Sequence, residues 1–270
     1  RAFREAKKME GPVLLHVMTK KGKGYAPAEE QPDKFHGVGP FEVRTGEVNE
    51  PKKKDTYTDV FGKVLCDAAS ENKRITAITA AMADGTGLKR FAHMFPDRFF
   101  DVGIAEGHGV TFAAGLAAGG MKPVFAVYSS FLQRGYDQII HDVALQNLPV
   151  VLAVDRAGLV GSDGETHQGI FDLSYLGSTP NMTVMAPKHK WELADMLRFA
   201  LSYDGPIALR YPRGTAYDGF EEYRAPIVYG KSEMIVREKD IALLPAGHMF
   251  EEAVKIRELL KERGYSCTLV

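Results

Sequence analysis

Short apolar runs alternate with longer amphipathic segments through the middle of the chain. The runs are near-continuous in Val, Ile, Leu and Ala, which is typical of strands buried on both faces. We predict strands at residues 75–80, 99–102, 123–127, 150–154, 183–185 and 207–209. We predict helices at residues 58–71, 88–94, 105–118, 131–146 and 190–202. This alternation predicts an α/β fold, a parallel sheet with helices on both faces.

The two ends of the chain follow different patterns. Residues 1–9 resemble the end of a helix, residues 13–19 a short buried strand, and residues 20–54 a glycine-rich loop that crosses to a new domain. After Pro226 the pattern restarts, with strands expected at 232–236 and 241–244 and a helix at 249–263 ending at Gly264.

Three domain segments follow from these patterns: 1–50, 51–225 and 226–270. The chain starts without Met inside a helix-like segment and stops inside a strand-like one, so we expect a fragment.

Composition and charge exclude several classes of function. The 34 Lys and Arg residues and 35 Asp and Glu residues give a net charge of −1, which excludes a broad electrostatic grip on nucleic acid or an anionic membrane surface. The uncharged stretch at 107–121 is too short and glycine-rich to span a membrane. Cys66 and Cys267 lie far apart and form no disulfide framework, which indicates a reducing compartment.

Common local motifs are missing: there is no GxGxxG after a strand, no P-loop, no HExxH and no EF-hand loop, and the eight histidines do not cluster at metal-ligand spacing. We therefore expect a site built from separate segments at the carboxyl ends of the strands, where ligands bind in open parallel sheets.

Two of these strand ends carry acidic or aromatic residues. Glu106 starts a helix of small apolar residues and has two interpretations, a carboxylate that complements the helix dipole or one whose raised proton affinity serves a ligand. Local features favour the first. Tyr128 and Phe131 flank two serines that could cap a helix, and they are either core aromatics or a cofactor-stacking pair. Arg134 and Asp137 look like a solvated or interface pair.

Two further strand ends carry positive charge. Arg156, Asp163 and His167 share a glycine-rich loop, which suits a surface loop and an anion and carbonyl site equally well. Arg210 and Arg213 follow the last strand of the sheet, where either could bind phosphate or serve the structure.

Together these segments resemble one family. IAEGHGVTFAAGLA, the stretch from VYSSFLQRGYDQ to DRAGLVGSDGETHQGIFDLSYL, and RYPRG are similar to 1-deoxy-D-xylulose-5-phosphate synthase, a thiamine-diphosphate enzyme of the transketolase superfamily. Residues 19–43 are similar to the end of that family's first domain, so the likeness covers essentially the whole chain. DRAGLVGSDGETHQG is highly specific, whereas RYPRG alone would be weak.

The resemblance implies a cytoplasmic homodimer (or a plastid one, in a plant or alga) that uses thiamine diphosphate and Mg²⁺. The reaction joins pyruvate and D-glyceraldehyde 3-phosphate with loss of carbon dioxide, and its product feeds isoprenoid precursors, thiamine and pyridoxal phosphate. This chain would hold the tail of a diphosphate-binding domain, a whole pyrimidine-binding domain and the start of the transketolase C-terminal domain.

Residue roles follow from the matching motifs. Glu106 matches the glutamate that hydrogen-bonds N1′ of the aminopyrimidine, Phe131 the aromatic that packs on that ring, and Tyr25 a cofactor-contacting tyrosine. His36 and His167 match active-site histidines. The residues that match the family's substrate pocket are Tyr128, Arg156, Asp163, His167 and Arg213. Arg210 matches no role and is expected to be structural.

The chain departs from the family at the metal site. The family binds Mg²⁺ and diphosphate through a GDG motif that does not occur here, so we expect no metal ligand in this chain and no turnover by it alone. The alternatives are a transketolase, the β-type subunit of a 2-oxo acid dehydrogenase, or a non-catalytic pyrimidine-domain subunit that needs a partner chain. The KGKGYAPAE loop and FHGVGPF favour the synthase, and the gene length upstream of Arg1 discriminates between an intact synthase and a split subunit.

Overall fold

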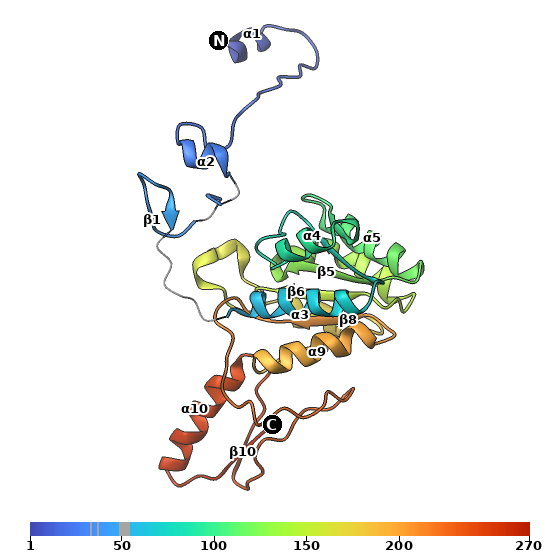
Figure 1. The fold of residues 1–270 in the computed structure, drawn as a ribbon, viewed down its shortest axis with the longest axis vertical. Helices are drawn as coiled ribbons and strands as arrows, with labels where there is room; N and C mark the ends of the chain where they lie inside the picture. Colours follow the sequence, from blue (N-terminus) through green and yellow to red (C-terminus); the bar gives the residue numbers. More distant parts are fainter. Residues whose placement is uncertain (33, 37, 49–54) are drawn as a thin grey trace. The chain divides into compact units, whose positions relative to one another are not determined.

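The structure is a computed structural model that describes residues 1–32, 34–36, 38–48 and 55–270 (Figure 1). The chain forms two compact units, Arg1–Lys53 and Lys54–Val270, which we describe separately.

The first unit contains only short elements. They are α1 (Ala2–Ala6), α2 (Ala26–Glu30) and an antiparallel pair, β1 (Phe41–Glu42) with β2 (Glu47–Val48). The region expected to be a loop thus contains a helical turn and a hairpin. Gly22 is required there, because its backbone is left-handed (φ 77°) and a Cβ would lie 2.5 Å from the carbonyl oxygen of Ala28.

The buried strand predicted at residues 13–19 is wrong. These residues form no strand, and Leu14 and Met18 are 95% and 85% exposed. A strand exists only where its backbone N–H and C=O groups pair with a neighbour, and within the described part of the first unit β1 and β2 pair only with each other.

The second unit is built on a six-stranded sheet in the order β4-β3-β5-β6-β8-β7, in which every neighbouring pair is parallel. The strands are β3 (Ile75–Thr79), β4 (Phe99–Asp101), β5 (Lys122–Tyr128), β6 (Val151–Asp155), β7 (Thr183–Met185) and β8 (Ile207–Arg210). All six strands predicted from the apolar runs are present, and the predicted fold class is confirmed.

Helices cover both faces of this sheet, as Figure 1 shows. One face packs against α3 (Tyr57–Glu71), α4 (Lys89–Met94) and α9 (Lys190–Ser202). The other packs against α5 (Glu106–Ala118), the π-helix η3 (Ile139–Ala144) and α8 (Asp172–Gly177). Successive strand residues serve opposite layers: Val151 and Ala153 lie in the first, Leu152 and Val154 in the second.

The segment predicted as a helix over 131–146 is helical through Ala144, but it is not one regular α-helix. The segment consists of α6 (Ser129–Leu132), the 3-10 helix η2 (Gln133–Gly135), α7 (Tyr136–Gln138) and η3. Gly135 is buried against α5, where a Cβ would lie 2.9 Å from Val110 Cγ2, so tertiary packing sets the path here. The predicted serine caps are absent as well, since Tyr128 is the N-cap and α6 has no side-chain capping bond.

The C-terminal part of the second unit forms a small substructure of its own. Parallel strands β9 (Ile241–Leu243) and β10 (Cys267–Leu269) are joined by α10 (Met249–Glu262), close to the predicted elements. The strand predicted at 232–236 is wrong, because only Ile235 and Val236 bond to Leu269, as an isolated bridge.

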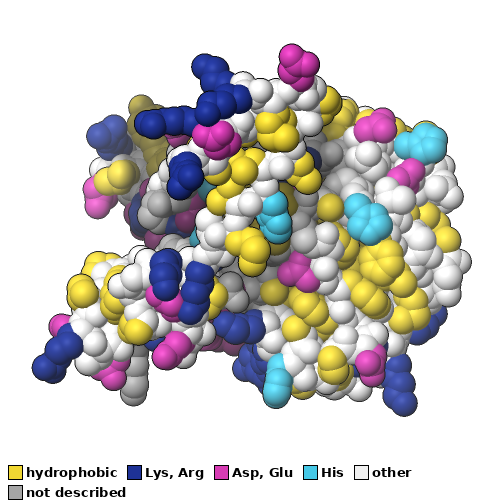
Figure 2. Space-filling model, turned by 90° about the horizontal axis from the view of Figure 1, so that it is seen from above, with side chains coloured by type: hydrophobic (Ala, Val, Ile, Leu, Met, Phe, Trp, Pro, Cys, Tyr) yellow, Lys and Arg dark blue, Asp and Glu magenta, His cyan; other side chains and the backbone are white. Residues whose placement is uncertain are grey.

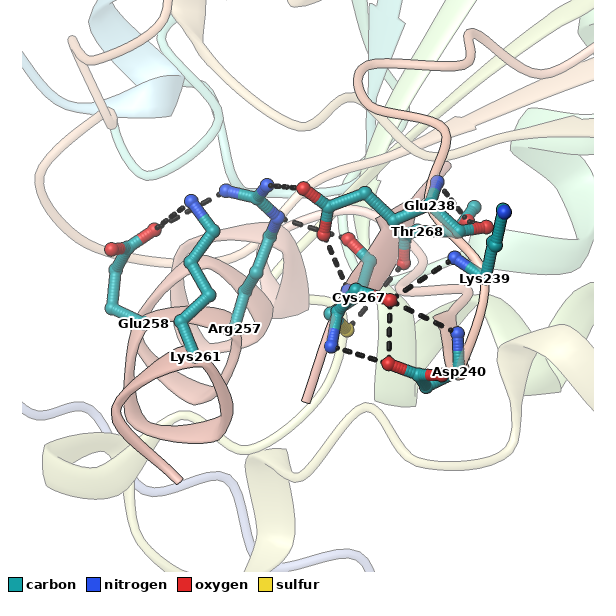
Figure 3. Close-up of polar contacts among 9 residues, drawn as sticks. Glu238, Lys239, Asp240, Arg257, Glu258, Lys261, Cys267 and Thr268 are labelled. Atoms are coloured by element: carbon teal, nitrogen blue, oxygen red, sulfur yellow. Dashed lines mark hydrogen bonds and ion pairs between the residues drawn. The ribbon is translucent and has the colours of Figure 1, made fainter. Parts of the chain in front are cut away.

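A polar network ties α10 to these strands (Figure 3). Arg257 donates from Nη2 to Glu238 (2.9 Å) and from Nε to the carbonyl oxygen of Cys267 (3.0 Å). Glu238 also accepts from the Cys267 amide, and Thr268 Oγ1 donates to the Glu238 carbonyl oxygen at 2.8 Å. One arginine of the helix therefore fixes both the strand and the loop that precedes β9.

Across the described residues, no helix combines the length and the apolar character that crossing a bilayer requires.

The start of α3 offers a local test of the fold. Thr56 and Asp59 form a capping box, with Thr56 Oγ1 accepting from the Asp59 amide at 3.1 Å and the Thr56 amide donating to Asp59 Oδ2 at 2.9 Å. Thr56→Ala removes the cap, which costs about 1 kcal/mol, and should speed hydrogen exchange of the first-turn amides roughly fivefold. Ser70→Ala, at the other end of α3, is the control and should leave these amides unchanged. Equal protection in both variants would contradict the capping geometry.

Candidate functional site

The candidate site lies at the edge where the carboxyl ends of β3, β5 and β6 meet. The sheet order places β4 and β5 on opposite sides of β3, so the chain changes direction across the sheet at this point. Such a switch point leaves a crevice beyond the strand ends, where α/β proteins bind ligands. Tyr128 and Asp155, the last residues of β5 and β6, are aligned in register at this edge.

Glu106 is the first residue of α5, and only 3% of it is exposed. Its carboxylate forms an ion pair with Arg134 Nη1, from η2. Arg134 therefore pairs with Glu106 and not, as predicted, with Asp137. The helix N-terminus and the guanidinium both favour negative charge at this position.

Aromatic rings surround this pair. The Arg134 guanidinium lies 4.9 Å from the centroid of Phe131, a cation–π distance. Phe131 stacks on Tyr128 with centroids 5.7 Å apart, and His167 meets Phe131 edge-on at 5.0 Å. The acidic residue and the aromatic residues singled out in the sequence thus form one continuous surface.

Arg156 stands at the centre of the basic part of the site. Its backbone is left-handed (φ 58°), which is uncommon for a residue other than glycine. Its guanidinium lies 4.1 Å from the Tyr128 ring centroid and donates to the carbonyl oxygen of Gly85. Burial raises the pKa of the Tyr128 hydroxyl, so this ring is a neutral support for the cation.

Asp163 brings two arginines together. Its Oδ1 lies 2.5 Å from Arg213 Nη1, and its Oδ2 lies 3.7 Å from Arg156 Nε. Arg156 Nε and Asp163 Oδ2 are buried and, within the described part of the chain, make no hydrogen bond. These two buried atoms therefore face one another at ion-pair distance without a hydrogen bond between them.

Asp155 belongs to the site, although no motif or pattern singled it out in the sequence. It is fully buried, and burial raises the pKa of its carboxyl to about 6, although Arg156 and Thr58 act to lower it. The one available signal was its position as the last residue of an apolar strand, directly before Arg156.

The structure gathers seven of the predicted site residues at this edge, six through direct contacts and Glu106 through Arg134. They are Glu106, Tyr128, Phe131, Arg156, Asp163, His167 and Arg213. The structural role predicted for Arg210 agrees with its buried ion pair, since Arg210 Nε donates to Asp172 Oδ2 at 2.9 Å.

Tyr25 and His36 belong to the first unit, which is described by itself. Tyr25 donates its hydroxyl to the Val43 carbonyl oxygen at 2.8 Å and packs against Phe35 and Phe41. His36 is exposed. Among the described residues of both units, no three His, Cys, Asp or Glu side chains are grouped so as to hold a metal ion.

Comparison with known proteins defines the class of protein to which this fold and site belong. Residues 53–217 match the family described as "Transketolase, pyrimidine binding domain". The chain belongs to this family.

The relatives narrow the assignment within that class. The chain is 57% identical over 269 residues to the 1-deoxy-D-xylulose-5-phosphate synthase of Lachnoclostridium phytofermentans, a match that covers 100% of this chain and 43% of that protein. It is 54% identical over 269 residues to the synthase of the same name from Clostridium acetobutylicum, covering 98% and 43%. The resemblance predicted from the motifs is confirmed, and the chain spans less than half the length of these relatives.

Solved structures share the fold. A "Split gene transketolase, inactive beta4 tetramer" superposes with a TM-score of 0.71 at 26% identity, covering 80% of this chain and 70% of that one. The transketolase of Campylobacter jejuni gives a TM-score of 0.72 at 20% identity, covering 81% and 35%.

The packing of Tyr128 makes a specific prediction for Gly85. A Cβ at Gly85 would lie 1.7 Å from Tyr128 Oη, so Gly85→Ala should overpack the site, cost about 1–3 kcal/mol and lower the melting temperature of the full-length protein. Tyr128→Phe removes that oxygen and should recover part of the loss when combined with Gly85→Ala.

Gly115→Ala is the matched control. Gly115 lies in α5 with no heavy atom within 4 Å of its Cβ position, so alanine should stabilise that helix slightly. A Gly85→Ala protein as stable as the parent would show that Tyr128 does not occupy this position.

Proposed function

We propose that the protein containing this chain is a 1-deoxy-D-xylulose-5-phosphate synthase, which joins pyruvate to D-glyceraldehyde 3-phosphate with loss of carbon dioxide. The observation that carries the proposal is the continuous cluster from Glu106 through Phe131 and Tyr128 to Arg156 and Asp163. It combines an acid and an aromatic face with two arginines. The identity of 52–57% to synthases of that name supports the proposal.

The residues fit the aminopyrimidine part of thiamine diphosphate. Such a ring needs a carboxylate at its edge and an aromatic group on its face, and Glu106 and Phe131 supply both. Ser130 and Gln138 lie close to Phe131 in the sequence. Their side-chain atoms Ser130 Oγ and Gln138 Oε1 are buried and have no hydrogen-bond partner among the described residues. Thiamine diphosphate, when bound, would supply the nucleophilic carbon that adds to pyruvate.

Glu106 would hold a proton at N1′ of the pyrimidine ring. Its burial removes competing water, and its place at the helix N-terminus fixes the direction of the carboxylate. General acid–base groups held in this way contribute about 10²–10⁴-fold in rate.

Arg156 and Arg213, with Tyr128, would bind the phosphate of the acceptor substrate. Asp163 holds the two guanidinium groups next to one another, which is the arrangement that a phosphate group needs for several charge-assisted hydrogen bonds. Asp163 and His167 would orient the carbonyl and hydroxyl groups and relay protons. The family likeness assigns Tyr25 to cofactor binding and His36 to the catalytic residues.

We assign residues 1–50 to the end of a diphosphate-binding domain, 51–225 to the pyrimidine-binding domain and 226–270 to the start of a C-terminal domain. The family match at 53–217 and the division of the chain after Lys53 support this scheme. Mg²⁺ and the diphosphate would be held by residues outside this chain.

The proposed protein is a cytoplasmic homodimer that serves isoprenoid and thiamine biosynthesis. Hydrophobic side chains reach the surface in many places on the face shown in Figure 2, which is compatible with a partner subunit. Exposed large hydrophobic residues of the second unit include Ile104, Leu159, Ile170 and Phe171, which are 53–82% exposed.

A second candidate is a separately encoded pyrimidine-domain subunit. The likeness to a split-gene transketolase subunit, of which this chain covers 70%, favours it. A start codon directly before Arg1 would support this candidate, and an upstream reading frame of a few hundred residues with a GDG motif would support the single-chain synthase.

The test uses the full-length protein with pyruvate, glyceraldehyde 3-phosphate, thiamine diphosphate and Mg²⁺. Deoxyxylulose phosphate should form, and Glu106→Gln should slow its formation by about 10²–10⁴-fold, because an amide cannot take up the N1′ proton. Glu71→Gln, at the exposed end of α3, is the control and should act as the parent does. A parent enzyme that makes no product, or prefers a ketose donor, contradicts the proposed activity.

A further inference from the structure

Asp155 and Arg156 are adjacent in sequence, yet their side chains contact each other. Successive residues of a strand normally point to opposite faces. Here β6 ends at Asp155, and the left-handed backbone of Arg156 turns its guanidinium back toward the carboxylate. Asp155 Oδ1 accepts from the Arg156 amide at 2.7 Å and lies 3.1 Å from Arg156 Nη1.

The carboxylate of Asp155 is anchored from the other side as well. Thr58 Oγ1, in the first turn of α3, donates to Asp155 Oδ2 at 2.8 Å. Helix α3, which contributes no predicted site residue, therefore helps to position the Asp155 carboxylate.

Arg156 is consequently held from several directions before any ligand binds. Asp155 lies beside it, the Tyr128 ring covers its guanidinium at 4.1 Å, the Gly85 carbonyl oxygen accepts from Nη1, and Asp163 lies near Nε. Only 12% of the Arg156 side chain is exposed. An arginine fixed in this way loses little further conformational freedom when it binds an anion, which improves affinity.

We propose that Asp155 is the positioning residue of the phosphate site, holding the Arg156 guanidinium and its backbone so that the enzyme prefers a phosphorylated acceptor over an unphosphorylated one. The inference rests on the proposed function in one respect, that Arg156 binds the phosphate group of the acceptor.

The first experiment compares two acceptors, D-glyceraldehyde 3-phosphate and D-glyceraldehyde, with the full-length enzyme. Asp155→Asn keeps the shape and removes the charge, so the ratio of the two kcat/KM values should fall on the order of tenfold or more, mainly through KM for the phosphate substrate. Thr58→Val removes only the anchoring hydrogen bond, so its ratio should fall by a few fold.

Asp172→Asn is the matched control. Asp172 is also a buried aspartate that pairs with an arginine, Arg210. Among the described residues, Asp172 makes no ion pair or hydrogen bond with a proposed substrate-binding residue. Its ratio should stay within about twofold of the parent, so that a general loss of stability is separated from a loss of phosphate preference.

A second measurement does not depend on turnover. Glycerol 3-phosphate carries the phosphate but no carbonyl, and calorimetry should show weaker binding in Asp155→Asn than in the parent and in Asp172→Asn. If the parent makes no product yet binds glycerol 3-phosphate in this Asp155-dependent way, the proposed activity fails and the positioning role stands.

The pH dependence of KM for the phosphate substrate distinguishes a positioning role of Asp155 from a merely structural one. The groups facing Asp155 are Arg156, Tyr128 and Tyr211, with Asp163 acting through Arg156. Since the pKa of Asp155 is raised to about 6, its charge is lost as pH falls through 6, and KM for the phosphate substrate should rise more steeply in the parent than in Asp155→Asn. Ionisation of the substrate phosphate affects both proteins equally.

Lowering the pH has the opposite effect on the stability contributed by Asp155. A carboxyl whose pKa is higher in the folded than in the unfolded protein is less costly when protonated, so this group stabilises the fold as pH falls from about 6 toward 4. Protonation of Asp155 therefore does not unfold the protein between about pH 6 and pH 4, and a loss of phosphate affinity in that range has another cause than unfolding by this group.

One result would overturn the proposal: an acceptor ratio in Asp155→Asn equal to that of the parent, including the case in which both kcat/KM values fall by the same factor. If Asp155→Asn does not fold, Thr58→Val decides, and an unchanged ratio in that variant overturns the positioning role.

Discussion

The parallel direction of all six strands is the constraint on which the site depends. Because neighbouring strands run the same way, their carboxyl ends meet at one edge, and residues distant in sequence become neighbours there. The register pairs Tyr128 with Asp155 across β5 and β6, which brings the aromatic surface next to the basic one. Glu106 reaches the same edge because α5 begins just after β4, the strand on the far side of β3.

The charges of the site are paired, which is how a cluster of arginines fits a chain with a net charge of −1. Glu106 pairs with Arg134, Asp155 with Arg156, and Asp163 with Arg213. Removing charges from water is costly, so the buried Asp155–Arg156 pair is a weak source of stability, and the other two pairs are partly exposed. Their value here lies in holding each arginine at a fixed position, and burial of Asp155 places that arrangement within reach of a pH change near 6.

Much of this architecture could be predicted from the sequence, for a physical reason. Strands buried on both faces are continuous apolar runs, and the strand-end rule then selects residues such as Tyr128, Arg156 and Arg213. The Glu106–Arg134 pair could not be predicted, because it joins two helices 28 residues apart in sequence through tertiary packing. Asp155 was missed because it ends an apolar run. The change of helix type around Gly135 was missed because it arises from close packing on α5. The apolar run at 13–19 resembles a strand, but pairing decides whether a strand forms.

We propose that the residues at the carboxyl ends of β3, β5 and β6 bind the pyrimidine half of thiamine diphosphate. A structure of the full-length protein with thiamine diphosphate and Mg²⁺ tests it most directly. The account predicts the aminopyrimidine ring against Phe131, with N1′ within hydrogen-bond distance of the Glu106 carboxylate. A cofactor bound elsewhere, with Glu106 still covered only by Arg134, would contradict it.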